Sequence, residues 1–161
     1  QFNADACFTR TPNVICAVMT ADCLPILLTD EAGSFVAAVH CGWRSLYKNI
    51  LSTTIQAIKP DVQVKAWLGP CIQQNQYEVD ADFVSSYLAE HPDAQCAFTP
   101  TVNQKSQASL YKMAEVQLLK LGVKQVNRSD ECTFLNHTFF SWRRDKTPHR
   151  MGSLIWLQGD E

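Results

Sequence analysis

Short apolar segments separated by turn residues dominate the first 40 positions and constrain the fold more than any other feature. Residues 14–19 and 24–28 are rich in Val, Ile and Leu, and Thr20-Ala21-Asp22 separates them. Residues 35–40 resume the apolar pattern after the turn-forming residues 30–34. Such runs are typical of buried strands. The sequence therefore predicts that residues 24–28 and 35–40 form a β-hairpin.

The rest of the chain mixes helical and extended patterns. Apolar residues recur every three or four positions over residues 43–58, which predicts one helix that ends before Pro60. A short helix is expected from residue 81 to 88, and a long one from about residue 105 to 121, capped by Gly122. Further strands are expected over residues 64–68, 123–126, 138–142 and 153–157.

These elements predict an α+β fold in a single domain that covers residues 1–161, with a mixed β-sheet and helices packed on it. A composition of 46% hydrophobic and 19% charged residues is typical of one packed globular unit. The formal net charge of −2 provides no basic field that would draw the chain to nucleic acid or to an anionic membrane. The longest apolar runs, such as residues 35–39, are far shorter than the roughly 20 residues of a membrane-spanning helix.

The chain has seven cysteines, an odd number with no Cys-x-x-Cys pair. A secreted disulfide framework usually has an even number of cysteines in a smaller chain. The cysteine content therefore predicts a reducing compartment, with the cytoplasm as the expected location.

Cys23 and His40 flank the predicted hairpin and are the leading candidates for chemistry. A register in which paired residue numbers sum to 63, with its centre inside residues 30–34, would place them directly opposite each other, with Cβ atoms about 4.5–5.5 Å apart. A thiolate and an imidazole at that separation can share one divalent ion or act as nucleophile and base. Catalytic zinc usually takes three protein ligands, so a third ligand is needed. The alternative is a buried thiol beside a hydrogen-bonded histidine at a strand end.

Basic residues offer candidate anion sites. Residues 40–45 join a strand to a helix, so free backbone N–H groups and Arg44 could hold a phosphate or carboxylate, unless Arg44 is a solvated charge. Arg143 and Arg144, with Arg150, could also bind an anion; alternatively they are solvated and paired with Asp145. The three histidines other than His40 follow turn signals and are expected at the surface: His91, His137 and His149.

Several motifs, in this order along the chain, resemble the YfiH family, also called the multicopper polyphenol oxidase or laccase-domain family. The most specific are Asp-Cys-Leu-Pro at residues 22–25 and His-Cys-Gly-Trp-Arg at residues 40–44. Leu-Gly-Pro-Cys at residues 68–71 and Phe-Phe-Ser-Trp-Arg-Arg-Asp-Lys-Thr at residues 139–147 continue the match. The resemblance extends from about Ala4 to Leu157.

The resemblance implies a metal site, usually described as zinc although copper is possible, held by one cysteine and two histidines. Cys23 and His40 match two of these ligands. The other histidine of the family pattern lies upstream of the region that matches Gln1, so we expect a domain incomplete at its N-terminus. Cys41 and His149 stand where the family has other residues; Cys41 could add a ligand or fill space, and His149 could lie near the mouth of the pocket.

The function that the resemblance implies is a purine nucleoside enzyme. Such enzymes cleave adenosine, inosine, guanosine or methylthioadenosine with phosphate, and they deaminate adenosine. The expected partners are therefore a small-molecule nucleoside and phosphate, with Arg44 holding phosphate and Asp22 orienting water or a ligand. Zinc with an open position lowers the pKa of bound water to about 7, which suits deamination.

Three alternatives stay open at this point. The first is a copper-dependent polyphenol oxidase, although several coppers would need more ligands than four histidines supply. The second is a cysteine hydrolase in which His40 activates Cys23. The third is a non-enzymatic module in which this pair is structural.

Overall fold

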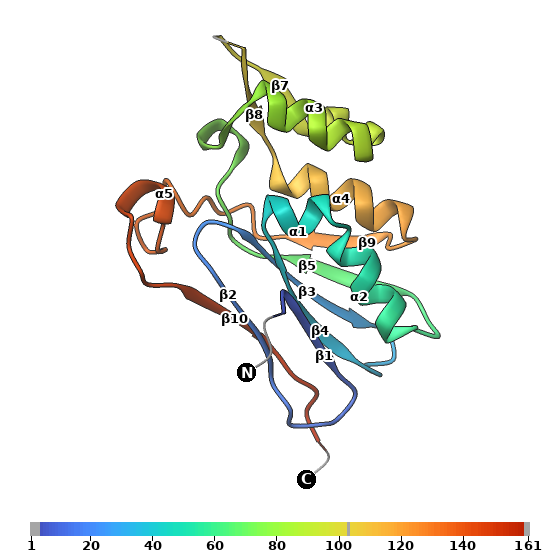
Figure 1. Cartoon of the computed structure of the whole chain (residues 1–161). Coiled ribbons are helices and arrows are strands. Elements are labelled where there is room, and N and C mark those ends of the chain that lie inside the picture. Colours follow the sequence, from blue (N-terminus) through green and yellow to red (C-terminus); the bar gives the residue numbers. More distant parts are fainter. Residues whose placement is uncertain (1–3, 103, 160–161) are drawn as a thin grey trace.

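A five-stranded mixed sheet forms the centre of the computed structural model, which describes residues 4–102 and 104–159 (Figure 1). Its strand order is β1 (Ala6–Thr9), β4 (Val36–Cys41), β3 (Leu24–Asp30), β5 (Val64–Leu68) and β9 (Gln125–Arg128). Neighbouring strands are antiparallel except for β5 and β9, which are parallel. The predicted mixed sheet and the β3–β4 hairpin are therefore confirmed.

Helices cover one face of this sheet. Helices α1 (Trp43–Tyr47), α2 (Ile50–Ile58) and α4 (Leu110–Lys120) lie beside one another over it (Figure 1). The main apolar core lies between them, with Leu24 and Ile26 from β3 packed with Leu46 and Leu118 from the helices, all fully buried. No helix in the described ranges is long and apolar enough to span a bilayer.

A two-stranded ribbon covers the other face. Strands β2 (Cys16–Thr20) and β10 (Met151–Ile155) pair antiparallel and lie across the central sheet (Figure 1). A second, smaller apolar cluster forms here, in which Val36 and Ala38 of β4 pack with Cys16 of β2. Because β4 is covered on both faces, its sequence is a continuous apolar run instead of an alternating one.

A further small sheet lies beyond α4. Strands β6 (Glu78–Asp80), β8 (Lys105–Ala108) and β7 (Phe98–Pro100) form a small antiparallel sheet in that order. Helix α3 (Ala81–Glu90) packs beside it (Figure 1). The short helices of the chain complete the fold: η1 (Gln74–Gln76), η2 (Pro92–Ala97) and α5 (Trp142–Asp145).

Two predicted helices differ from the structure. The single helix expected over residues 43–58 is wrong, since Asn49 takes a left-handed conformation with φ of 58° and separates α1 from α2. Asn tolerates this conformation better than most residues. The long helix begins at Leu110 and not near residue 105, because Lys105–Ala108 pair as β8 and the Ser109 hydroxyl caps the helix by accepting from the Lys112 amide at 3.3 Å.

The strand expected over residues 138–142 is wrong. The guanidinium of Arg144 donates to the carbonyls of Thr133, Phe134 and Phe139 at 2.8–2.9 Å and holds this aromatic segment as a loop. The Ser141 hydroxyl then caps α5. The strand at residues 64–68 is confirmed, and the last two strands begin two residues away from their expected starts.

Candidate active site

Cys23 and His40 lie on the same face of the hairpin, although not directly opposite each other. The register pairs Pro25 with His40 and Leu24 with Cys41, so the expected direct pairing of Cys23 with His40 is wrong. The centre of the observed register lies between Ala32 and Gly33, one residue later than expected. Gly33 has φ of 63°, a conformation that glycine adopts readily in a turn. The register shift is two residues, and side chains alternate with a period of two. Cys23 and His40 therefore remain diagonal neighbours on one face.

Gly42 is the position over which the two side chains meet. A side-chain carbon on Gly42 would lie 3.1 Å from Sγ of Cys23 and 3.7 Å from Nε2 of His40. The backbone of Gly42 has φ of −71°, which any residue can adopt, so the restriction is steric. The glycine in His-Cys-Gly-Trp-Arg leaves room for a thiol and an imidazole that lie within 4 Å of a common point.

A carboxylate orients the imidazole from its other side. Oδ1 of Asp5 lies 3.1 Å from Nδ1 of His40, and the Ser45 hydroxyl donates to Oδ2 of Asp5 at 2.6 Å. The hydrogen bond from Ser45 lowers the pKa of Asp5 and outweighs the opposite effect of burial. The contact with His40 lowers this pKa further. With Nδ1 donating to Asp5, Nε2 is the ring nitrogen on the side of Cys23.

The charge on His40 depends on both neighbours. Hydrogen bonding to Cys23 raises the pKa of His40 to about 9, burial opposes this, and Asp5 adds to the rise. The sequence reasoning missed Asp5 and Ser45. Asp5 is 35 residues from His40, and no local spacing signals a contact between side chains so far apart in the chain.

Asp22 forms hydrogen bonds that hold two C-terminal segments against the turn before Cys23. Its Oδ1 accepts from the Thr133 hydroxyl and its Oδ2 from the backbone N–H of Arg143, each at 2.7 Å. Asp22 is 9% exposed and bounds the same cavity as Cys23. The contacts that the structure gives this carboxylate are structural, and its expected role in orienting water or a ligand stays a prediction.

Two adjoining cavities form a cleft beside Cys23. They have volumes of about 240 and about 420 Å³ and share Trp43, Tyr77 and Arg143. The inner cavity reaches Cys23, and Trp142 bounds it on another side. The residues that bound only the outer cavity include the acidic Glu78, Asp80 and Asp82.

Tyr77 and Arg143 provide the polar groups in the middle of the cleft. The Arg143 guanidinium lies 5.3 Å from the centre of the Tyr77 ring. Burial and the nearby Cys23 raise the pKa of Tyr77 to about 12, against the opposing charges of Arg143 and Arg44. The phenol therefore stays protonated at neutral pH and can donate a hydrogen bond.

The other predicted basic residues do not bound this cleft. Arg44 is exposed and stacks on Trp43, 4.3 Å from the ring centre, and it does not line either cavity. Arg144 bonds to backbone carbonyls and pairs with Asp145 at 2.7 Å, and Arg150 donates to the carbonyls of Thr147 and His149. Arg143 is therefore the member of its cluster that faces the cleft.

The remaining histidines and Cys41 have other surroundings. The expectation that His91 lies at the surface is wrong, since it is 5% exposed, bonds the Tyr47 carbonyl at 3.0 Å and stacks on Tyr87. His137 and His149 are exposed, as expected, and His149 lies against Phe140. Cys41 is fully buried in the helix-side core, where it fills space.

Cys23 and His40 fit part of a metal site. A thiolate and an imidazole are donors that suit Zn²⁺ and Cu⁺. Over residues 4–102 and 104–159, no group of three Cys, His, Asp or Glu side chains is placed to hold an ion. The two donors therefore supply part of a coordination sphere, and Asp5 supplies the outer hydrogen bond that ligating histidines usually make.

Comparison with known proteins gives consistent matches. The model of the family described as multi-copper polyphenol oxidoreductase laccase matches residues 1–158. The chain is 46% identical over 157 residues to a purine nucleoside phosphorylase YfiH of Shigella flexneri and 43% identical over 156 residues to one of Escherichia coli. In each case the match covers 96% of this chain and 64% of the relative, so the chain spans less than two thirds of their length.

Solved structures agree with these matches. A Neisseria meningitidis protein superposes with a TM-score of 0.93 at 45% identity, covering 98% of this chain and 66% of that chain. YlmD from Geobacillus stearothermophilus superposes with a TM-score of 0.88 at 27% identity, covering 98% of this chain and 62% of that chain.

Proposed function

This chain belongs to the family described as multi-copper polyphenol oxidoreductase laccase, and on that premise we propose that it acts in the metal-assisted phosphorolysis of purine nucleosides. The observation that carries the proposal is the cleft beside Cys23, which is lined by aromatic side chains and one arginine. The names of the relatives in Shigella flexneri and Escherichia coli support the substrate class.

The walls of the cleft suit a purine base. Trp43 and Trp142 bound the inner cavity together with the phenol of Tyr77. Aromatic rings stack on flat heterocycles, and such stacking contributes about 1–3 kcal/mol per base where proteins bind nucleic acid. Tyr77, protonated at neutral pH, can donate to a ring nitrogen or a ribose oxygen.

Arg143 is the proposed phosphate-binding residue. It bounds both cavities, and its backbone N–H bonds to Asp22, which fixes its main chain beside Cys23. In the proposed reaction a phosphate oxygen forms a bond to C1′ of the ribose. The bond from C1′ to the base nitrogen breaks, its electron pair stays with the base, and the base takes up a proton. Arg143 offsets the charge of the phosphate during this step.

Cys23 and His40 are the proposed ligands of a zinc ion, with copper as the alternative metal. When bound, such an ion supplies a water whose pKa is lowered to about 7. Asp5 accepts the Nδ1 proton of His40, so Nε2 is the nitrogen that would coordinate the ion after losing its own proton. Deamination of adenosine, in which water adds at C6 and ammonia leaves, is the second activity that we propose for this site.

The test is an assay of inosine, guanosine, methylthioadenosine and adenosine with and without phosphate, with the free base, ribose 1-phosphate and inosine as products. Arg143→Gln should raise the KM for phosphate roughly tenfold or more, because it removes a charged hydrogen-bond donor. Arg128→Gln is the matched control, since Arg128 lies over the Tyr111 ring at 5.6 Å and outside the cleft. Absence of free base from every nucleoside would refute the proposal.

The same assay separates the two candidate arginines. If Arg44 holds the phosphate, as the sequence predicts, Arg44→Gln will raise the phosphate KM and Arg143→Gln will not. If Arg143 holds it, the order is reversed.

One observation favours a second function, a cysteine hydrolase. Asp5, His40 and Cys23 follow one another as carboxylate, imidazole and thiol, which is the order of groups in a nucleophilic triad. Chelation and alkylation distinguish the two functions. A hydrolase keeps its activity after metal removal and loses it when Cys23 is alkylated, whereas the phosphorylase proposed above loses activity in both treatments. The polyphenol oxidase activity and the cytoplasmic location stay predictions.

A further inference from the structure

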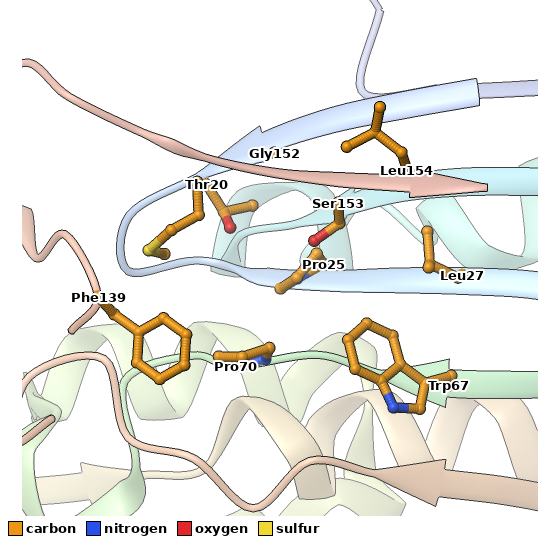
Figure 2. A pocket seen from close by; sticks show the side chains of 10 residues that line it. Thr20, Pro25, Leu27, Trp67, Pro70, Phe139, Gly152, Ser153 and Leu154 are labelled. Atoms are coloured by element: carbon orange, nitrogen blue, oxygen red, sulfur yellow. The ribbon is translucent and has the colours of Figure 1, made fainter. Parts of the chain in front are cut away.

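A second cavity, of about 300 Å³, lies between the β2–β10 ribbon and strands β3 and β5 (Figure 2). It shares no lining residue with the cleft beside Cys23. Thr20, Met151 and Ser153 line it from the ribbon, and Pro25 and Trp67 line it from the central sheet.

The sheet side of this cavity is a flat apolar surface built from rigid rings. A side-chain carbon on Gly69 would lie 2.7 Å from the Pro25 ring and 2.9 Å from the Trp67 ring, so these two rings meet over the glycine. Pro70 and Phe139 continue the surface, and Figure 2 shows Pro70 between Trp67 and Phe139. Rings with few rotatable bonds lose little conformational entropy when a ligand packs on them.

The ribbon side presents a hydroxyl without a partner. Thr20 is 2% exposed, and its Oγ1 makes no hydrogen bond within the part of the chain that the structure describes. Figure 2 shows this oxygen facing the space above Pro25, with the Ser153 hydroxyl on the same side. A buried hydroxyl without a hydrogen-bond partner destabilises the fold, and a ligand that pairs with it recovers part of this cost.

We propose that this cavity binds a small, uncharged aromatic molecule whose ring lies on Trp67 and Pro25 and whose polar group pairs with the Thr20 hydroxyl. A volume of about 300 Å³ is at the lower end of small-molecule pockets and fits one or two rings. None of the described residues that line it is charged, so it has no group to offset a ligand charge. Two aromatic side chains and an orphaned hydroxyl match a ring with one hydrogen-bonding substituent. The proposal does not depend on the proposed function of the cleft.

Phenol and toluene are the probes that test it, because they have nearly the same shape and differ in one hydroxyl. Phenol is uncharged at neutral pH, since phenolic groups have a pKa near 10. In an NMR titration of the chain, phenol should bind about fivefold more tightly than toluene, the contribution of one neutral hydrogen bond. The amide signals that move should belong to Thr20, Met151 and Ser153.

Two variants separate the hydrogen bond from the apolar surface. Thr20→Val keeps the shape of the side chain and removes its hydroxyl, so phenol should lose its fivefold advantage while toluene binds as before. Trp67→Leu should weaken both probes, and it gives a second test if Thr20→Val does not fold. Arg143→Gln changes only the cleft and should leave both affinities unchanged.

Three results would overturn the proposal. The first is that neither probe binds, and the second is that phenol keeps its advantage over toluene in Thr20→Val. The third is that the amide signals that move belong to Tyr77 and Trp43 in the cleft. Loss of the advantage in Thr20→Val, with toluene binding retained, supports it.

Discussion

The hydrogen bond from the Thr133 hydroxyl to Asp22 offers a direct measure of how strongly the turn before Cys23 is held. Thr133 is fully buried, and its Oγ1 donates to Oδ1 of Asp22 at 2.7 Å. Thr133→Val keeps the side-chain shape and removes the donor. Hydrogen bonds to charged groups contribute about 1.5–3 kcal/mol, and among the described residues the Asp22 carboxylate would keep the bond from the Arg143 amide. We expect a loss of about 2 kcal/mol in the free energy of unfolding.

Thr54→Val is the matched control. Thr54 is 5% exposed, and its hydroxyl donates to the Ile50 carbonyl at 2.8 Å, so burial and bond length are similar while the acceptor is neutral. This carbonyl lies inside α2, and loss of the bond should cost about 0.5–1 kcal/mol.

Urea unfolding followed by circular dichroism measures both variants. Thr133→Val should also lower Tm by about 4–8 °C, since 1 kcal/mol corresponds to about 2–4 °C in a domain of this size. If Thr133→Val costs no more than Thr54→Val, the Asp22 carboxylate does not hold the C-terminal segment, and the reasoning is refuted.

Three further predictions concern the site and the hairpin. Gly42→Ala should weaken Co²⁺ binding, measured by the thiolate absorption band, by tenfold or more, because the new carbon lies 3.1 Å from the Cys23 sulfur; Gly152→Ala, whose carbon meets Leu154 at 3.4 Å, should not. Burial raises the pKa of Asp30, but hydrogen bonds from Ser34 outweigh burial and lower that pKa. The stability that Ser34 contributes is therefore complete above the ordinary pKa of 3.8 and is lost as the pH falls below it. The free-energy cost of Ser34→Ala in urea unfolding should then be smaller at pH 3 than at pH 7. Cys23→Ala should abolish turnover and change Tm little, whereas a fall in Tm with turnover retained would favour the non-enzymatic module.

The local sequence alone predicts those elements whose side chains meet the same environment along their whole length. The runs at residues 24–28 and 35–40 are covered on both sides, so burial alone makes them apolar, and the hairpin follows from them. The helix expected over residues 81–88 is present as α3, but the small sheet beside it was missed, because its strands are three or four residues long and too short to show a period.

The aromatic segment at residues 138–142 shows the opposite case. Its composition favours a strand, but the Phe139 carbonyl, which a strand would pair with a neighbour, bonds to the Arg144 guanidinium together with two carbonyls that precede the segment. A side chain from outside the segment decided its conformation, and no pattern within the segment signals that.

The sequence by itself identified the candidate groups for chemistry, since the motifs at residues 22–25 and 40–44 contain the thiol, the imidazole and the glycine that leaves room for them. Only the tertiary structure decided how these groups are supported. Asp5 reaches His40 across two paired strands, and Thr133 reaches Asp22 from 111 residues away, because the fold and not the spacing brings them within hydrogen-bond distance. A hydrogen bond acts over about 3 Å, and distances of that size between remote residues are set by packing of the whole domain.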